Sequence, residues 1–319
     1  MIEVKNLTKR YGNHLAVDHL NFTVESSKIY GFLGPNGAGK STTMNIMTGY
    51  LGATEGQVLI DGHDILKEPE EAKKNIGYLP EIPPLYMEMT VREYLEFAAE
   101  LKGIKKDKRE PQIEEVIRLA KLRDVENRLI QNLSKGYKQR VGLAQAVLGF
   151  PEIIILDEPT VGLDPKQIIE IRELIRKLAK KHTVILSSHI LAEVREVCDY
   201  IMIISGGKLV ASDTTENLEN MMSGKGQIEV EAKASRDEMD HIIRRTGKIK
   251  EVKYRTSASG ITTAQIIAKG GEDIREELFL AFSHADVPML TLNQSKTTLE
   301  EIFLELTQGS GNRMIKEEK

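Results

Sequence analysis

The sequence contains the octapeptide Gly34-Pro35-Asn36-Gly37-Ala38-Gly39-Lys40-Ser41, which fits the pattern G-x-x-x-x-G-K-[ST]. Glycines in such a loop let the backbone N–H groups turn inward around phosphate oxygens, because no Cβ atom blocks the approach. The apolar run 28–33 before the loop is typical of a buried strand, and 42–47 after it is typical of a helix whose positive end faces the same anion. The pattern therefore predicts a site for a nucleoside triphosphate.

Each part of this phosphate loop has an expected role. All eight residues and Thr42 are expected to bind the nucleotide, with Thr42 helping to hold the α- and β-phosphates. Lys40 is expected to reach the β- and γ-phosphate oxygens and to assist catalysis. The Ser41 hydroxyl is expected to take one coordination position on Mg²⁺.

Length and composition restrict the class of protein. The chain of 319 residues is long enough for two domains, and its 44 basic and 48 acidic residues argue against a general nucleic-acid-binding surface. The single cysteine, Cys198, excludes an internal disulfide and is compatible with a reducing cytoplasm. No apolar run is long enough to cross a bilayer, and the amino terminus predicts no secretory signal.

The pattern of apolar residues predicts an α/β fold for the first two thirds of the chain. Short strands are expected at 2–4 and 20–24, ahead of the phosphate loop. Apolar residues at helical spacing predict a helical subdomain at about 89–148. Strands and helices then alternate, as they do in a parallel sheet. The elements expected there are strand 152–157, helix 166–179, strand 183–187, helix 190–197, strand 200–204 and strand 208–211.

A second domain is expected at 227–319, after a first domain at 1–217 and a linker at 218–226, where glycine and serine become frequent. Its expected order is β-α-β-β-α-β, the split βαβ arrangement of a small α+β ferredoxin-like domain, followed by a closing helix at 298–306. The expected elements are strand 227–231, helix 236–246, strand 251–256, strand 261–268, helix 272–284 and strand 288–292.

Two adjacent carboxylates narrow the chemistry, since a phosphate loop also occurs in kinases, GTPases and motor ATPases. The apolar strand 153–156 ends in Asp157 and Glu158. Asp157 is placed to bind Mg²⁺, and Glu158 is placed to orient the attacking water or accept its proton. Two solvated acids at the tip of a buried strand are the structural alternative.

A second motif precedes these carboxylates and carries a family resemblance: Leu133-Ser134-Lys135-Gly136-Tyr137. The chain resembles the ATP-binding cassette of ABC transporters over roughly 1–217, and this form of the motif is similar to that of ABC-2-type bacterial ATPases. The family signature is Leu-Ser-Gly-Gly-Gln, so Lys135 and Tyr137 depart from it. The resemblance implies that the Ser134 hydroxyl and the Gly136 N–H point at the γ-phosphate of ATP held by another subunit. Ser134 is also expected to cap the helix that follows.

Four further positions match motifs of the family. The resemblance implies that Tyr11 stacks on adenine, although a tyrosine in the core or on the surface is the alternative. Glu81 stands where the Q-loop usually has glutamine, and its carboxylate can hold Mg²⁺ or its water. Asp164 is expected to act across the dimer and also to cap the next helix. His189 follows a strand and is expected to hydrogen-bond the γ-phosphate, with a structural role as the alternative.

The resemblance as a whole implies an α/β P-loop NTPase fold, the ABC cassette, with a mixed sheet core, an antiparallel β subdomain and a helical subdomain. It implies an ATPase in which two cassettes, in a homodimer or a heterodimer, enclose two ATP molecules with Mg²⁺. Closure on ATP and opening after hydrolysis would drive separate transmembrane permease subunits, mostly for export. The expected location is the cytoplasm, peripheral on the inner face of the cell membrane.

The alternative is a soluble ATPase of the same family that acts as a regulatory switch or on nucleic acid or ribosomes. DNA-repair members carry long coiled coils between the phosphate loop and the signature, whereas 99 positions separate Gly34 from Leu133 here. Translation factors of the family carry two cassettes in one chain, and this chain has one. A sensing role for the second domain would need a pocket with convergent polar groups, and the sequence has no motif for one. No direct nucleic-acid binding is expected.

Overall fold

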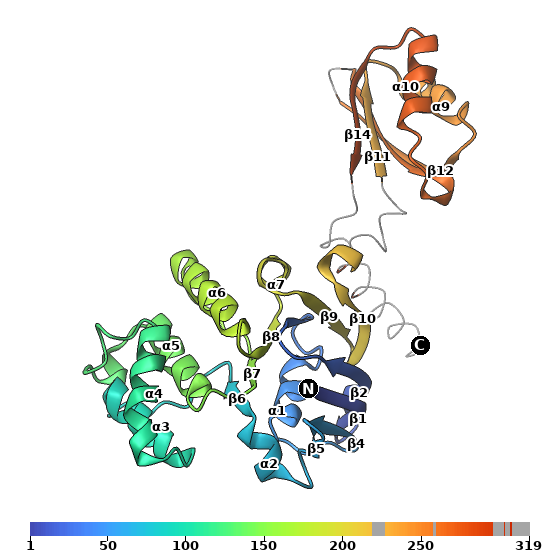
Figure 1. The fold of residues 1–319 in the computed structure, drawn as a ribbon. Helices are drawn as coiled ribbons and strands as arrows, with labels where there is room; N and C mark the ends of the chain where they lie inside the picture. Colours follow the sequence, from blue (N-terminus) through green and yellow to red (C-terminus); the bar gives the residue numbers. More distant parts are fainter. Residues whose placement is uncertain (219–226, 258–259, 296–302, 304–306, 308–319) are drawn as a thin grey trace. The chain divides into compact units, whose positions relative to one another are not determined.

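The computed structural model describes residues 1–218, 227–257 and 260–295, together with Phe303 and Thr307 (Figure 1). The chain divides into two compact units, Met1–Thr215 with Leu306–Lys319, and Glu216–Glu305. The predicted linker lies outside the described residues except for Leu218, so the predicted boundaries at 217 and 227 stay predictions. The predicted closing helix at 298–306 lies outside them except for Phe303.

Two sheets form the centre of the first unit (Figure 1). An antiparallel sheet has the order β2-β1-β4-β5, and a mixed sheet has the order β10-β9-β3-β8-β7-β6. In the mixed sheet β10 alone pairs antiparallel, which confirms the predicted α/β core and antiparallel subdomain. The strands are β1 (Ile2–Tyr11), β2 (His14–Val24), β3 (Ile29–Leu33), β4 (Glu55–Ile60), β5 (His63–Asp64), β6 (Ile76–Leu79), β7 (Ile153–Leu156), β8 (Thr183–Ser188), β9 (Tyr200–Ser205) and β10 (Lys208–Thr214).

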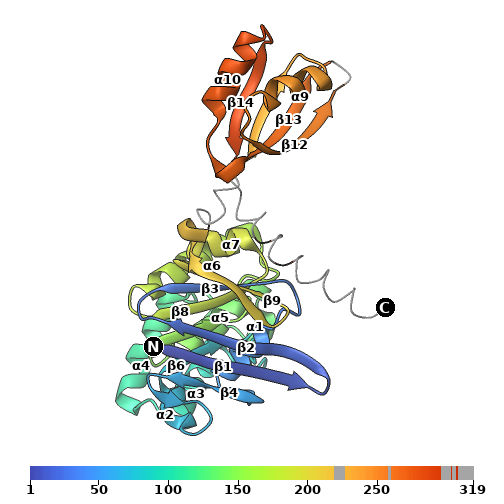
Figure 2. The same cartoon turned by 90° about the vertical axis from the view of Figure 1, so that its right-hand side faces the viewer.

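β1 and β2 form a long hairpin, visible in blue in Figure 2. The strands predicted at 2–4 and 20–24 are present, but they are not short, since β1 has 10 residues and β2 has 11. The pairing register shifts between Val4 and Leu7, and Asn6 has a positive φ of 49°. Such bulges break the alternation of buried and exposed residues on which a strand prediction depends. The hairpin carries Tyr11 to the end of β1, next to the turn at Gly12.

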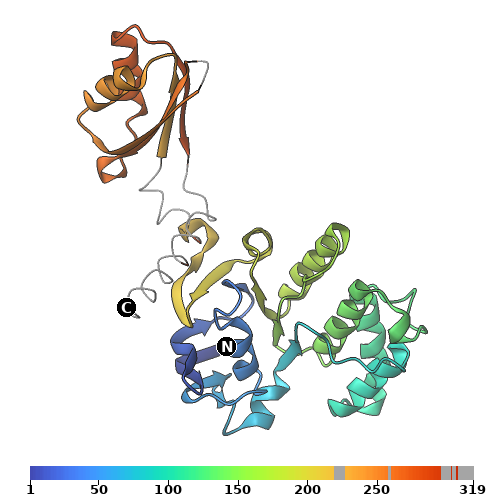
Figure 3. The same cartoon turned by 180° about the vertical axis from the view of Figure 1, so that it is seen from behind.

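The predicted helical subdomain consists of three helices that pack against one another: α3 (Val91–Leu101), α4 (Lys106–Leu119) and α5 (Lys135–Val147) (Figure 3). The other helices of the unit are α1 (Lys40–Met47), α2 (Pro69–Lys74), α6 (Pro165–Ala179) and α7 (Leu191–Val197). Within the described ranges, no helix combines the length and the apolar character that crossing a membrane requires.

The second unit has one antiparallel sheet of order β12-β13-β11-β14. Two helices, α9 and α10, pack on one face of this sheet, over a core that includes Ile228, Ile266 and Phe282 (Figure 3). The predicted β-α-β-β-α-β order is the order observed, whereas assignment to the ferredoxin-like folds stays a prediction. The elements are β11 (Gln227–Ala232), α9 (Arg236–Arg244), β12 (Ile249–Thr256), β13 (Thr262–Ala268), α10 (Arg275–His284) and β14 (Met289–Ser295).

Candidate functional site

Four neighbouring parallel strands bring their carboxyl-terminal loops together at one edge of the mixed sheet. β3 leads into the phosphate loop, β6 leads toward Glu81, β7 into Asp157 and Glu158, and β8 into His189. A cavity of about 520 Å³, here called the phosphate cavity, opens at these loops. Its walls are formed by Tyr11, His14, Ala16, Asn36, Gly37, Gly39, Lys40, Ser41, Thr42, Glu81, Glu158, Val161 and His189.

The phosphate loop owes its shape to glycine. Gly39 precedes α1 with a φ of 102°, and a Cβ atom added there would lie 2.5 Å from the carbonyl oxygen of Ala16. Another side chain would therefore strain the backbone and push the loop off the β1–β2 hairpin. Among the described residues, no side chain caps α1, so the N–H groups of its first turn stay open to an anion.

Lys40 is folded back onto the loop that carries it. Its side chain is buried, and its Nζ donates to the carbonyl oxygens of Gly34 at 2.8 Å and Pro35 at 3.3 Å. The carboxylate of Glu158 lies 3.5 Å away. These oxygens compensate the burial of the ammonium group, which would otherwise be unfavourable. The lysine is thus held at the wall of the cavity by groups that phosphate oxygens can replace.

Hydroxyl groups link the carboxylates to the phosphate loop. The Ser41 Oγ donates to Asp157 Oδ1 at 3.2 Å, and the Ser187 Oγ donates to the same oxygen at 2.5 Å. The backbone N–H of Glu158 in turn donates to Ser187 Oγ at 2.9 Å. One serine of β8 therefore fixes both the side chain of Asp157 and the backbone of Glu158.

The pair Ser41 and Asp157 offers the hard oxygen ligands that Mg²⁺ prefers. Glu81, the third residue predicted to bind the ion, lines the same cavity. Across the described part of the chain, no cluster of three or more His, Cys, Asp and Glu side chains could hold a metal ion by itself. The residues present therefore fit an ion that keeps waters and takes phosphate oxygens as its remaining ligands.

Glu158 has an unusual backbone conformation, with a φ of 46°. A left-handed conformation at such a residue costs about 1–3 kcal/mol and persists when the surroundings fix it. Ser187 helps to fix this backbone through the Glu158 N–H, and His189 fixes the side chain, since its Nδ1 lies 3.0 Å from Glu158 Oε2 and can donate to that oxygen. The turn directs a nearly buried carboxylate into the phosphate cavity, between Lys40 and His189.

Seven predicted site residues do not line the phosphate cavity of their own chain. Gly34, Pro35 and Ala38 belong to the phosphate loop itself, and Asp157 reaches the loop through Ser41. Ser134, Gly136 and Asp164 lie instead at the starts of α5 and α6. Ser134 caps α5 by accepting a hydrogen bond from the Tyr137 N–H at 3.4 Å, which confirms the predicted cap. Asp164 likewise caps α6 through the Gln167 N–H at 2.9 Å. A Cβ atom at Gly136 would lie 2.5 Å from the Gln167 side chain, so the two helix starts lie close together.

Tyr11 and Glu81 lie at the rim of the cavity. The Tyr11 side chain is about half exposed, and the Lys9 ammonium lies 5.3 Å from the centre of its ring. Glu81 also lines a second, more apolar groove of about 840 Å³, together with Tyr50 and Ile82. Glu81 is therefore shared by the cavity and the groove.

The roles of Ser187 and Glu193 were not predicted from the sequence. Glu193 is buried and accepts hydrogen bonds from Thr160 at 2.5 Å and Ser188 at 3.1 Å, which ties the loop after β7 to α7. The sequence does contain one indication of these roles, because the pair Ser187-Ser188 directly precedes the predicted site residue His189. Its meaning depends on the pairing of β7 with β8, which the local sequence does not give.

The site combines a glycine-rich loop at the start of a helix, a carboxylate pair after a neighbouring strand and a histidine beside that pair. This combination defines the class of the protein as a P-loop ATPase of the cassette type. Residues 17–161 match the family model described as ABC transporter. The bacitracin transport ATP-binding protein BcrA of Bacillus licheniformis is 42% identical over 221 residues, which cover 69% of this chain and 71% of that protein.

Two further relatives extend the comparison. The linearmycin resistance ATP-binding protein LnrL of Bacillus subtilis (strain 168) is 30% identical over 308 residues, which cover 96% of this chain and 98% of that protein. A solved dimer of the ATP-binding cassette MJ0796, in a post-hydrolysis state with ADP and Pi, has a TM-score of 0.61 and 28% identity, covering 67% of this chain and 98% of that one. The chain belongs to the ATP-binding proteins of ABC transporters, and it is the ATPase subunit that energises such a transporter.

Proposed function

We propose that the phosphate cavity holds the triphosphate of ATP and that Glu158 is the general base for its hydrolysis. The observation that carries this proposal is the convergence of Lys40, Glu158 and His189 on one cavity at the start of α1. In the attack, a water oxygen bonds to the γ-phosphorus while the bond to the β–γ bridging oxygen breaks. The electron pair leaves with ADP, and Glu158 accepts the proton of the water.

Lys40 and the loop supply the charge compensation. On nucleotide binding, the Lys40 ammonium exchanges the carbonyl oxygens of Gly34 and Pro35 for phosphate oxygens. The N–H groups of the first turn of α1 act on the same phosphates. His189 orients the Glu158 carboxylate and offers its ring to the γ-phosphate.

Mg²⁺ is proposed to accompany the nucleotide, held by Ser41 and Asp157 with Glu81 acting directly or through water. When bound, the ion neutralises charge on the phosphate oxygens. Its protein ligands are positioned by the chain itself, since Ser187 holds Asp157 next to Ser41. The acidic Glu81 in the place of a glutamine adds negative charge to this group.

The complete site is proposed to need a second cassette. Ser134, Gly136 and Asp164 lie outside their own chain's cavity, and the dimeric MJ0796 cassette supports an arrangement in which they face the ATP of another subunit. The partner is a second copy of this chain or a homologue. This proposal gives each ATP the phosphate loop of one subunit and the signature of the other.

The groove beside Glu81 is proposed to receive a transmembrane permease subunit. Tyr50 and Ile82 line it with side chains that are 84% and 82% exposed, and exposed large apolar groups of this kind mark interaction sites. Because Glu81 lies in both the groove and the phosphate cavity, docking and nucleotide binding share a residue. We further propose a location on the cytoplasmic face of the membrane and export as the direction, which the relatives named for bacitracin transport and linearmycin resistance support.

The Glu158→Gln variant tests the proposed base. Removal of a general base lowers turnover by about 10²–10⁴-fold, whereas the amide retains the size needed for ATP binding. We expect ATP binding and an ATP-dependent dimer to persist while phosphate release stops, measured by a phosphate assay and by size-exclusion chromatography with light scattering. Glu152→Gln is the matched control, since Glu152 is exposed at the opposite end of the same strand. Full turnover in Glu158→Gln would reject the assignment.

A further inference from the structure

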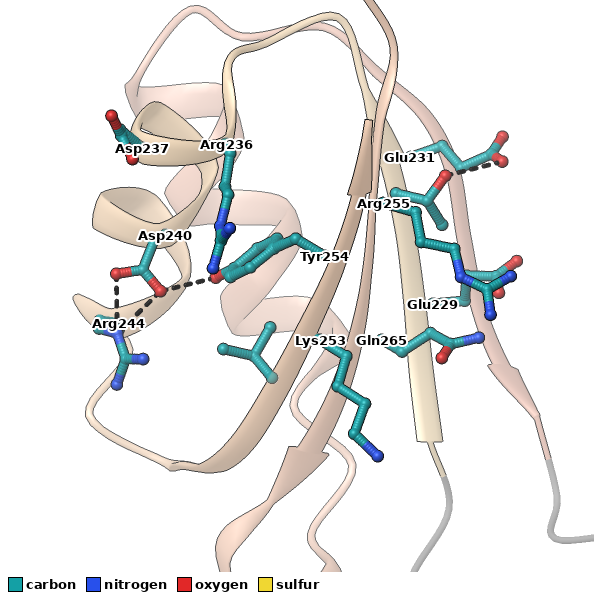
Figure 4. Close-up of a pocket in the computed structure, with 12 residues that line it drawn as sticks. Glu229, Glu231, Arg236, Asp237, Asp240, Arg244, Lys253, Tyr254, Arg255 and Gln265 are labelled. Atoms are coloured by element: carbon teal, nitrogen blue, oxygen red, sulfur yellow. Dashed lines mark hydrogen bonds and ion pairs between the residues drawn. The ribbon is translucent and has the colours of Figure 1, made fainter. Parts of the chain in front are cut away.

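The second unit has one sheet face that its helices leave open. α9 and α10 cover the face that carries Ile228, Ile266 and the rest of the core. The opposite face carries polar and charged side chains, among them Glu229, Gln265 and Arg255, which Figure 4 shows on the side away from α9. No motif of the cassette accounts for this face.

Strand register arranges these side chains in two rows across the sheet. Glu229 on β11 pairs with Gln265 on β13, and Gln265 pairs with Lys253 on β12. One step along, Glu231 pairs with Thr263, and Thr263 pairs with Arg255. Directly paired residues of an antiparallel sheet point to the same face. Each row therefore runs from a carboxylate through a neutral side chain to a cation.

The rows separate the charges into two columns. In these two rows the carboxylates stand on β11 and the cations on β12, about 10 Å apart across the neutral residues of β13 at a strand spacing of about 4.8 Å. Glu251 of β12 lies on the same face and forms an ion pair with Lys253 at 3.5 Å, and with Arg255 the β12 side of the face stays net positive. Within the described residues, no ion pair crosses this gap, and neither Glu229 nor Arg255 forms a hydrogen bond or ion pair with its side chain. Thr291 and Thr263 hold Glu231 in place, at 3.0 Å and 3.4 Å.

We propose that this open face binds the same face of a second copy of the chain, related by a two-fold axis along β13. Such an axis exchanges the two charged columns, so that Glu229 faces Lys253 of the second copy and Glu231 faces its Arg255. Gln265 and Thr263 then meet their own equivalents on the axis. A two-fold axis across the strands would instead set β11 against β11, carboxylate against carboxylate. The charges thus select both the partner and its orientation.

A second copy fits this face better than a small molecule does. The concavity of about 850 Å³ that includes the face is lined mainly by charged residues of both signs, whereas ligand pockets are mostly apolar with a few polar groups. A surface with separated columns of opposite charge is complementary to itself. The pairing rests on the proposed function in one respect: it supplies a second contact between the two ATPase subunits of one transporter.

Charge reversal tests the pairing, with Lys40→Ala as the background in every arm so that association through ATP does not contribute. The acidic columns are reversed in Glu229→Lys/Glu231→Lys, and the basic columns in Lys253→Glu/Arg255→Glu. Analytical ultracentrifugation of the full chain at low salt is expected to show dimers of the background protein that weaken as salt rises. Each reversed variant alone is expected to dimerise at least tenfold more weakly.

Two further samples complete the test: a mixture of the two reversed variants, and a single chain that carries all four substitutions. An equimolar mixture of the two reversed variants is expected to form heterodimers, because a face with a strong excess of basic side chains then meets an acidic one. The chain with all four reversals is expected to recover self-association, which excludes loss of folding as the cause. A background protein that stays monomeric, or reversed variants that dimerise like it, would overturn the pairing and leave the face to another partner. Because no arm needs ATP hydrolysis, failure here leaves the proposed ATPase mechanism intact.

A short bis-maleimide linker provides an independent measurement. Gln265→Cys places a thiol near the proposed axis, about 10 Å from its equivalent if the sheets stack at the usual distance. Rapid cross-linking to a covalent dimer is expected, whereas Ser283→Cys on the exposed part of α10 should react much more slowly. The native Cys198 is buried, and the unsubstituted chain measures its background. Equal rates for the two variants would count against the orientation.

Discussion

The two units of this chain use the same kinds of residue in different ways. In the first unit, the charged side chains of Lys40, at the start of α1, and Glu158, after β7, are buried, and they are held by backbone carbonyl groups, by each other and by His189. In the second, Glu229 and Arg255 stand on an open sheet face. A site for phosphate needs a particular backbone and therefore leaves a motif, whereas a face built from cross-strand rows leaves none. A functional site can be predicted from a single sequence only where its chemistry requires a particular backbone conformation.

Removal of a core side chain from the second unit is expected to have the largest effect on stability. Phe282 is 1% exposed, and Phe282→Ala should cost about 3–5 kcal/mol in the unfolding of that unit. ATPase activity should stay within about twofold, because the phosphate cavity belongs to the first unit. Calorimetry and a phosphate assay check the two halves of this expectation. The control is Ser283→Ala, at an exposed neighbouring position, and a parallel loss of activity would show that the units are not separable.

Alanine at Gly39 is expected to break the phosphate loop. The φ of 102° and the 2.5 Å approach to the Ala16 carbonyl oxygen make a Cβ atom costly there. About 3 kcal/mol of strain corresponds to about a hundredfold weaker ATP binding, measurable with a fluorescent nucleotide. Gly247→Ala in the second unit is the matched control, since its φ is 70° but nothing lies within 4 Å of the added atom. Equal ATP affinity in both variants would contradict the geometric argument.

Mixing two inactive chains tests whether the site is shared between subunits. Lys40→Ala spoils the phosphate loop and Ser134→Arg spoils the signature, so one site of a mixed dimer remains intact. Activity should rise on mixing to at most about a quarter of the wild-type rate, because half of the dimers are mixed and each has one working site. Mixing Lys40→Ala with Glu158→Gln should restore no ATPase activity. Both residues belong to the half of the site that carries the phosphate loop, so each site of the mixed dimer lacks one of them. Two working sites per mixed dimer would refute the arrangement.

Acid is expected to have a smaller effect, on the helical subdomain. Hydrogen bonds from Arg123 and then Arg92 lower the pKa of Glu114 from its ordinary value of 4.5 to about 2. Because the pKa is lower in the folded state, the stabilising contribution is complete above about pH 4.5 and is lost as pH falls toward 2. The difference in urea midpoint between wild type and Glu114→Gln should therefore narrow across that window. A difference that is constant with pH would exclude this role for the carboxylate.

The features that could be predicted from the sequence depend on short stretches of neighbouring residues. The caps at Ser134 and Asp164 and the helix after the phosphate loop depend on a few neighbouring residues, and the structure has them where expected. The extent of β1 could not be predicted, because bulges around Asn6 interrupt its alternation. The role of Ser187 depends on two strands that are distant in the sequence and meet only in the sheet.

Contacts between strands that are distant in the sequence matter even more in the second unit, and the sequence alone does not give them. Its order of elements followed from periodicity, but the two charged rows arise from the register of β12, β13 and β11. A slip of one residue in either pairing would place these charges on opposite faces of the sheet. The periodicity of a single strand contains no information about which residue of another strand it meets. The candidate interface therefore became visible only with the structure.

The position of Lys40 also bears on how fast the enzyme can cycle. Its ammonium has the Gly34 and Pro35 carbonyl oxygens and the Glu158 carboxylate as partners. In the proposed mechanism, the phosphates of ATP compete with these oxygens for Lys40, so we expect a lower net affinity for ATP than an unpartnered lysine would give. The same competition is expected to favour release of ADP and phosphate, because Lys40 can return to the Gly34 and Pro35 carbonyl oxygens. Hydrogen bonds between Lys40 and its own loop are thus expected to weaken ATP binding and to speed product release.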